Sequence, residues 1–183
     1  MKALFLAAAA AALVSAAPAS ASTLVLGGSL AEACYQFAKQ RSPTLEAMQT
    51  CDRAINEELL TFDDRLATYV NRGILLMSRN DFRNAGDDFD RAIAMDASKP
   101  DPWLNKGNLL FRSGRSADAI PLFNKAIELG ADRAEFAYYG RALANEDTGN
   151  LRAAYADLRR AVELSPNWQA PARELARYHV RTR

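Results

Sequence analysis

The sequence predicts an all-α protein, an α-solenoid of stacked antiparallel helix hairpins. Three observations lead to this prediction. Apolar residues recur at helical spacing, the chain resembles itself with a period of about 34 residues, and clusters of Gly, Asn, Ser and Asp interrupt the apolar pattern halfway through each period. A chain of 183 residues, 49% of them hydrophobic and 25% charged, is also long enough to bury a core.

The first 21 residues are typical of a secretory signal peptide. A basic second residue is followed by an apolar run over residues 3–17, a proline and a small-x-small sequence at residues 19–21. The alternatives are a membrane anchor, for which the run is short of the roughly 20 residues needed, and a lipoprotein, for which Cys34 lies too far along the chain. We expect cleavage after Ala21 and no stable membrane insertion afterwards. A bacterial periplasm is favoured, and a eukaryotic secretory route stays open.

The charge of the chain argues against two classes of partner. It has 23 basic and 22 acidic residues, and loss of Lys2 with the leader leaves 23 − 1 = 22 basic residues. A balanced protein has no strong overall field, so we expect neither nucleic acid nor an anionic membrane as its main partner.

Three blocks of the chain align with one another. Each contains an aromatic residue, a glycine, a large apolar residue, an alanine, a second large apolar residue and a final alanine, in that order. The first two blocks lie 34 residues apart throughout, whereas the third needs a two-residue insertion in the turn EDTGN. The aligned residues are Tyr69, Gly73, Leu76, Ala85, Phe89 and Ala92, then Trp103, Gly107, Leu110, Ala119, Phe123 and Ala126, then Phe136, Gly140, Leu143, Ala154, Leu158 and Ala161.

Each block is expected to form a helix hairpin, because both halves are amphipathic at helical spacing. The glycine lets the second helix approach closely, and the large residue 16 to 18 positions later fills the space over it. For the third block this pairs Gly140 with Leu158. Successive hairpins must stack, since one hairpin cannot bury its outer face alone.

This order of residues, with Pro166 after the last alanine, resembles the tetratricopeptide repeat over residues 64–166. Repeats are expected at about 66–99, 100–132 and 133–167. The resemblance implies a non-enzymatic array that binds other proteins in a concave groove. We expect residues 168–183 to form one more helix that caps the array.

The two cysteines fit a degenerate N-terminal hairpin over residues 22–63. Cys34 stands where Gly73 stands in the next block and Cys51 where Phe89 stands, so the two should face each other and form a disulfide in an exported protein. A redox pair, a metal site and free thiols are the alternatives, but the chain has no C-x-x-C and only one histidine. Asp63 or Asp64 is expected to cap the helix that follows.

No catalytic constellation is recognisable in the sequence, and we expect no enzyme, cofactor or metal centre. His179 lies on the last predicted helix without a partner nucleophile. Asp87, Asp88 and Asp90 form an acidic cluster, which we expect to face solvent because no calcium-binding loop surrounds it.

The resemblance also implies which residues line the groove. The asparagines among them match positions that often hydrogen-bond a peptide backbone in the family, although they are also common consensus residues. Val70, Leu104 and Ala134 occupy lysine sites of the family's clamp for chaperone tails, which disfavours that subtype. The expected groove residues are Asn71, Ile74, Met77, Leu104, Asn105, Asn108, Phe111, Tyr138 and Arg141.

Three hypotheses about function follow. The first is a scaffold or adaptor in the periplasm or secretory space, monomeric or weakly self-associating, that binds a partly apolar peptide or helix of a partner protein. The second is a structural, self-assembling envelope component without a groove ligand. The third and weakest is a thiol–disulfide redox protein.

Overall fold

The computed structural model describes residues 29–178 of the chain. The predicted leader lies outside the described residues, as do His179, residues 22–28 of the predicted first hairpin and residues 179–183 of the predicted last helix.

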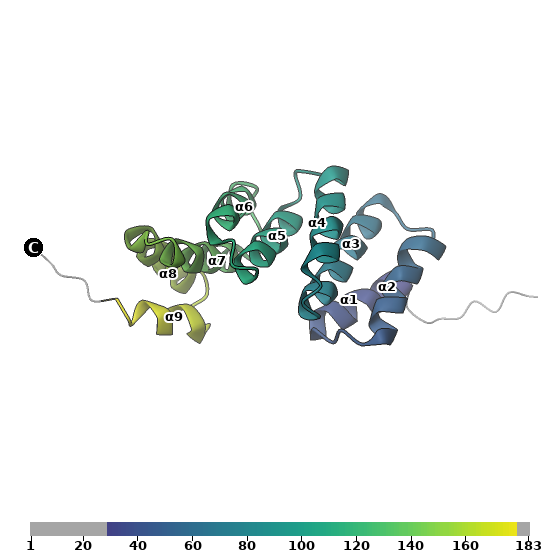
Figure 1. The fold of residues 1–183 in the computed structure, drawn as a ribbon, viewed down its shortest axis with the longest axis horizontal. Coiled ribbons are helices and arrows are strands. Elements are labelled where there is room, and N and C mark those ends of the chain that lie inside the picture. Colours follow the sequence, from purple (N-terminus) through teal and green to yellow (C-terminus); the bar gives the residue numbers. More distant parts are fainter. Residues whose placement is uncertain (1–28, 179–183) are drawn as a thin grey trace, which may run out of the picture.

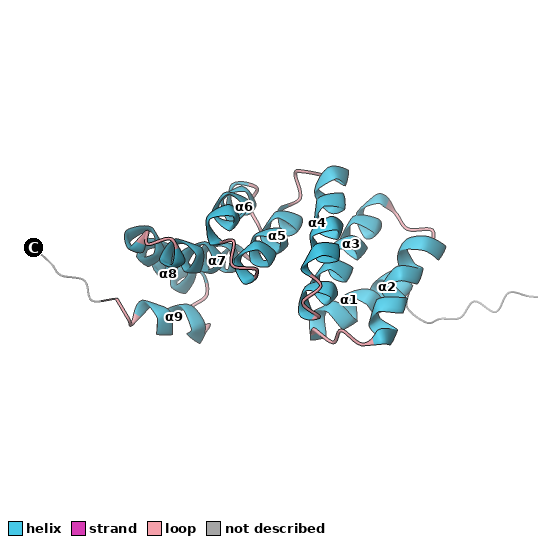
Figure 2. Cartoon of the chain, viewed as in Figure 1, coloured by secondary structure: helices cyan, strands magenta, loops and turns pink. Residues whose placement is uncertain are grey.

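Within residues 29–178 the secondary structure is α-helical, with nine helices and no strand (Figure 2). The all-α prediction is therefore confirmed. The helices are α1 Leu30–Gln40, α2 Leu45–Glu57, α3 Phe62–Ser78, α4 Phe82–Met95, α5 Pro100–Arg112, α6 Ser116–Glu128, α7 Ala134–Asp147, α8 Leu151–Leu164 and α9 Gln169–Leu175.

The helices pair into four hairpins that follow one another along the long axis of the molecule (Figure 1). The hairpins are α1/α2, α3/α4, α5/α6 and α7/α8, and α9 packs on α8 at the end. The first helix of each hairpin also contacts the first helix of the next. The predicted solenoid is thus confirmed, although α9 is shorter than the sequence suggested.

Close helix contacts in the middle hairpins depend on a glycine facing a phenylalanine. A Cβ added at Gly73 would lie 2.5 Å from Phe89 Cε1, and one added at Gly107 would lie 2.8 Å from Phe123 Cε1. Both phenylalanines are fully buried. The predicted pairing of small and large residues is confirmed in these two hairpins.

The third repeat follows a different register from the predicted one. The turns inside the three hairpins span residues 79–81, 113–115 and 148–150, so they are equally long and the turn EDTGN holds no insertion. The extra residue lies instead between α6 and α7, where residues 129–133 replace the four-residue connection 96–99.

This change moves every position of α7 by two residues relative to the predicted alignment. Three buried residues of α7 each lie 35 positions after a buried residue of α5. Ala142, Ala144 and Asn145 correspond in this way to Gly107, Leu109 and Leu110. Gly140 does not face Leu158: a Cβ added there would lie 2.6 Å from Phe123 Cζ, in the preceding hairpin. The sequence allowed both registers because aromatic residues stand at both 136 and 138, and small residues at both 140 and 142.

The N-terminal hairpin contains the predicted disulfide. Cys34 and Cys51 are bonded with a Cα–Cα separation of 4.9 Å, within the range that a disulfide spans, and both are 0% exposed. The following helix starts earlier than expected. Its N-cap is Thr61, whose hydroxyl accepts a hydrogen bond from the Asp64 N–H at 3.1 Å. The prediction that Asp63 or Asp64 caps this helix is therefore wrong.

Candidate functional site: a groove along the first helices

A cavity of about 620 Å³ runs along the first helices of the hairpins. Its volume falls within the roughly 300–1,000 Å³ that is usual for ligand clefts. It is lined by residues of α1, α3, α5 and α7, by Arg41 directly after α1, by Arg133 before α7 and by Trp168 before α9. All four hairpins therefore contribute to one continuous groove.

Seven of the nine residues expected in the groove line this cavity, while their role in binding stays a prediction. The seven come from α3 and α5, whose register was assigned correctly. They are Asn71, Ile74, Met77, Leu104, Asn105, Asn108 and Phe111.

Tyr138 and Arg141 do not line the cavity, so their expected placement is wrong. The cause is the two-residue shift of α7. Their expected structural positions are occupied by Gly140 and Leu143, which do line the cavity together with Tyr139. The predicted role of Arg141 in orienting a peptide is therefore replaced by a structural one.

Arg141 forms hydrogen bonds with side chains of two neighbouring helices instead. Its Nε donates to Asp157 Oδ2 at 2.9 Å and its Nη2 to Asp157 Oδ1 at 2.6 Å, which joins α7 to α8. Its Nη1 also donates to Asn124 Oδ1 of α6 at 2.6 Å. The hydrogen bonds to Asp157 raise the pKa of the Arg141 guanidinium above its ordinary value.

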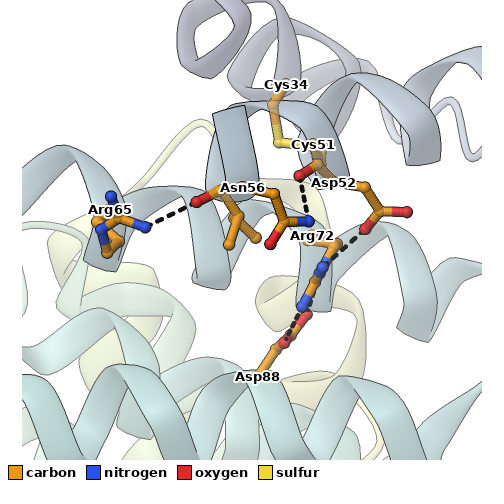
Figure 3. A network of polar contacts seen from close by, with 8 residues as sticks. Cys34, Cys51, Asp52, Asn56, Arg65, Arg72 and Asp88 are labelled. Carbon is orange, nitrogen blue, oxygen red and sulfur yellow. Dashed lines mark hydrogen bonds and ion pairs between the residues drawn. A yellow bond between two sulfur atoms is a disulfide. The ribbon is translucent and has the colours of Figure 1, made fainter. Parts of the chain in front are cut away.

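Arg72 holds the corresponding place in the first repeat (Figure 3). It donates from Nε and Nη2 to Asp88 at 2.8 and 2.7 Å, and from Nη1 to Asp52 of the preceding hairpin at 2.7 Å. Asp88 is only 2% exposed, so the prediction that this carboxylate faces solvent is wrong. Its burial is compensated by the bidentate pair, which also raises the pKa of Arg72.

In the middle repeat the equivalent cation is Lys106, which pairs with Asp90 of the preceding hairpin. Leu122 stands where Asp88 and Asp157 stand in the neighbouring repeats, so Lys106 has no carboxylate from its own second helix. These polar contacts lie apart from the groove and join successive hairpins. They stabilise the stack. A second, smaller cavity of about 270 Å³ lies beside Arg72, Asp52 and Asp88, whose charges are paired with one another.

The groove contains amide groups that are free to bind a ligand. Among the described residues, the side chains of Asn71 and Asn108 form no hydrogen bond, whereas Asn105 Nδ2 donates to the Asp101 carbonyl at 2.9 Å. An amide side chain can both donate to and accept from a peptide backbone. Ile74 and Leu104 lie in the same groove, so polar and apolar contacts are available together.

Aromatic residues gather where α7 meets the segment before α9. The ring of Trp168 lies edge-on to Phe136 at 4.7 Å and to Tyr139 at 4.9 Å between centroids. The guanidinium of Arg133 lies 4.0 Å from the centroid of the Phe136 ring. Burial raises the pKa of the Tyr139 phenol, in keeping with its partly apolar surroundings.

The charged residues that line the cavity are all basic. They are Lys39 and Arg41 from the first hairpin, Arg112 at the end of α5 and Arg133 before α7. No Asp or Glu of the described residues lines it. A locally positive groove therefore exists in a chain whose total charge is nearly balanced.

The lining residues that sequence reasoning missed include two groups with an identifiable cause. Tyr139 and Leu143 were missed through the register error, and the 16-residue spacing shared by Arg72/Asp88 and Arg141/Asp157 was a signal that could have corrected it. The first hairpin was interpreted only as a stabilised end, yet it supplies Tyr35, Ala38, Lys39 and Arg41.

The fold and the groove define an α-helical repeat protein with a concave ligand-sized cleft. A family model described as "Tetratricopeptide repeat" matches residues 70–134 and 104–167, which together span more than half of the chain. The chain belongs to the tetratricopeptide repeat family.

Several solved structures are similar to this chain in fold. MamA, residues 41 to the end, from Desulfovibrio magneticus RS-1 has a TM-score of 0.63 and 20% identity, covering 81% of this chain and 82% of that one. The first TPR of Spaghetti (RPAP3) bound to the HSP90 peptide SRMEEVD has a TM-score of 0.58 and 24% identity, covering 61% and 88%. The second TPR domain of human RPAP3 in complex with the HSP70 peptide SGPTIEEVD has a TM-score of 0.59 and 20% identity, covering 64% and 97%. A comparison with curated proteins found no match.

Two further observations concern other kinds of site. Over residues 29–178, no helix combines the length and the apolar character required to cross a bilayer. The same part of the chain contains no group of three or more His, Cys, Asp or Glu side chains placed to hold a metal ion.

Proposed function

We propose that this protein is a non-enzymatic adaptor that binds a peptide segment of a partner protein in the groove along α1, α3, α5 and α7. One observation carries the proposal: unpaired amides at Asn71 and Asn108 stand beside apolar side chains in a cavity of about 620 Å³. Unpaired amides that a ligand backbone can satisfy, next to apolar pockets, are the features by which grooves recognise peptides.

The similar structures support this proposal at the level of the fold. The two RPAP3 domains are bound to chaperone peptides, so domains of this fold can hold a peptide. Identities of 20 to 24% carry over the fold alone, and Val70 and Leu104 stand where the chaperone-tail clamp has lysine. We therefore propose a peptide ligand without assigning a chaperone tail.

Site-specific photocrosslinking tests the proposal. A photoreactive phenylalanine analogue at Asn105, which lines the groove, is expected to capture a partner in the producing cell, and mass spectrometry identifies the peptide. The same analogue at Arg83, an exposed position on α4 outside the cavity, is the matched control. When Asn71→Ala and Asn108→Ala are added to the variant with the analogue at position 105, the yield of crosslinked partner should fall. Equal yields at both positions would contradict a groove function.

We also propose that the protein acts after export, in the periplasm or secretory space, as a monomer or a weakly associating species. The leader-like residues 1–21 and the buried Cys34–Cys51 bond support this location, because disulfides persist in oxidising compartments. Binding in the groove of one chain needs no second copy. Light scattering should give the monomer mass at low concentration and at most a slight rise at high concentration, whereas a mass that rises to a defined oligomer would favour the self-assembling alternative.

A further inference from the structure

The charges in the groove point to the chemistry of its ligand. The chain as a whole is nearly neutral, yet four cations and no carboxylate of the described residues line the cavity. Like charges concentrated in a cleft focus the field and favour a ligand of opposite sign. This inference rests on the proposed function and concerns the class of peptide that the groove selects.

Three of the four cations are not neutralised by the protein. Among the described residues, no carboxylate lies within 4.0 Å of Lys39, Arg41 or Arg112. Arg112 donates only to the amide oxygen of Asn80, at 3.4 Å. By contrast, the cations that join successive hairpins each have a partner, as Arg72 does. The groove therefore retains positive charge that a ligand can pair.

These three cations lie on one edge of the groove. Successive first helices run in the same direction, because an antiparallel helix separates them. Arg41 caps the end of α1, and Arg112 is the last residue of α5 and contacts Asn80 just after α3. The cations thus gather where the first helices end.

The aromatic residues lie at a different part of the same groove. Phe136 and Tyr139 belong to the first half of α7, and Trp168 precedes α9 at the far end of the stack. Leu143 continues this apolar lining along α7. A ligand that spans the groove therefore meets unpaired cations on one side and aromatic faces on the other.

We propose that the groove selects a bipartite peptide segment, with carboxylate side chains over Lys39, Arg41 and Arg112 and a large apolar or aromatic side chain against Phe136, Tyr139, Leu143 and Trp168. The free amides of Asn71 on α3 and Asn108 on α5 line the same groove and hold the connecting backbone. The carboxylates supply orientation and association rate, and the apolar anchor supplies most of the affinity.

Selection from a random peptide library displayed against the purified protein, with its disulfide intact, tests this inference. Enriched peptides should carry Asp or Glu towards one end and Phe, Trp, Leu or Ile towards the other. Enrichment of neutral or basic peptides that bind in the groove would overturn the inference and leave the proposed function standing. No enrichment, or enrichment that a groove variant with Asn71→Ala and Asn108→Ala retains in full, would overturn both.

Variants of Lys39 and Arg112 test the role of the cations on this edge of the groove. Fluorescence anisotropy measures the Kd of the most enriched peptide. Lys39→Gln with Arg112→Gln should raise Kd roughly tenfold, and the effect should shrink as salt is added. Arg83→Gln with Arg152→Gln removes the same charge from exposed positions on α4 and α8 outside the groove. Equal losses in the two double variants would show that total charge, not the groove edge, governs binding.

Variants at the aromatic end test the anchor. Trp168→Ala should raise Kd by on the order of thirtyfold, as truncating a buried aromatic anchor does. Trp103→Phe is the control, because Trp103 does not line the cavity and its indole N–H donates to the Ala97 carbonyl. Should Trp168→Ala unfold α9, Leu143→Ala serves as a second variant at the same end. Unchanged affinity in a folded variant would overturn the anchor.

Discussion

Arg141 of α7 and Asp157 of α8 form a bidentate ion pair, 16 residues apart, that repeats the geometry of Arg72 and Asp88 in the first repeat. Asp157 is buried, with 8% of its side chain exposed, and Arg141 is its cationic partner. The pair therefore assigns Arg141 to the interior of the hairpin and identifies the register of α7.

Removing the cation of this pair should destabilise the protein. Arg141→Met leaves the Asp157 carboxylate buried without a cationic partner and with only the Asn145 amide at 3.4 Å, which costs about 3 kcal/mol of unfolding free energy. Urea unfolding followed by circular dichroism measures the loss. Lys106→Met is the matched control, because Asp90 is 56% exposed, and it should cost less than about 1 kcal/mol. Similar losses in both variants would contradict the buried pair.

A second comparison separates Arg141 from the groove. Because Arg141 does not line the cavity, the double variant Arg141→Met with Asp157→Leu should regain most of the lost stability and bind the selected peptide as the parent does. A fall in peptide affinity in this folded double variant would return Arg141 to the binding site.

Gly140→Ala should destabilise the protein through contact with the preceding hairpin. The new Cβ would lie 2.6 Å from Cζ of the fully buried Phe123, so overpacking should cost about 1–2 kcal/mol. Gly86→Ala is the control, since no atom lies within 4 Å of its added Cβ, and the higher helix propensity of Ala should stabilise by about 1 kcal/mol. Thermal or urea midpoints report both changes.

The partner of Gly140 can be identified by a double-mutant cycle. Phe123→Leu should relieve the cost of Gly140→Ala, whereas Leu158→Ala should add to it without coupling. Coupling to Leu158 instead would support the register predicted from sequence.

Loss of the disulfide should loosen α1 and weaken the groove. Cys34→Ala with Cys51→Ala opens a loop of 17 residues, which is worth about 3 kcal/mol, less any strain. Because α1 and the turn after it contribute Lys39 and Arg41 to the cavity, affinity for acidic peptides should fall as well. Hydrogen exchange should accelerate in α1 and α2 while α7 and α8 keep their protection, since each repeat contacts only its neighbours. Uniform acceleration along the chain would contradict this local role.

The export proposal predicts a defined N-terminus. Protein recovered from the producing cell should begin at Ser22, and its two cysteines should resist alkylation without reductant. Intact-mass spectrometry before and after thiol alkylation measures both properties. A chain that keeps residues 1–21 and reacts at both thiols would contradict export.

The local sequence pattern was sufficient to predict many of the contacts in this protein. The glycine–phenylalanine contacts at Gly73 and Gly107 and the facing of Cys34 and Cys51 were predictable, because residues 16 or 17 apart meet across a hairpin whose turn length is known. The register of α7 was not predictable in the same way, because the extra residue could enter either the EDTGN turn or the connection 129–133. The turn lengths, the buried residues of α7 and the contacts of Gly140 with Phe123 and of Arg141 with Asp157 separate these alternatives.

By itself, the sequence determined the helical class, the stack of hairpins, the disulfide and the groove residues of α3 and α5, because each depends on periodicity along a few dozen residues. The tertiary structure alone decided that Gly140 and Leu143 line the groove in place of Tyr138 and Arg141, that Asp88 is buried, and that the first hairpin supplies Lys39 and Arg41. These outcomes depend on how successive hairpins rotate and pack against one another, and a shift of two residues in a helix of 3.6 residues per turn carries a side chain to the opposite face.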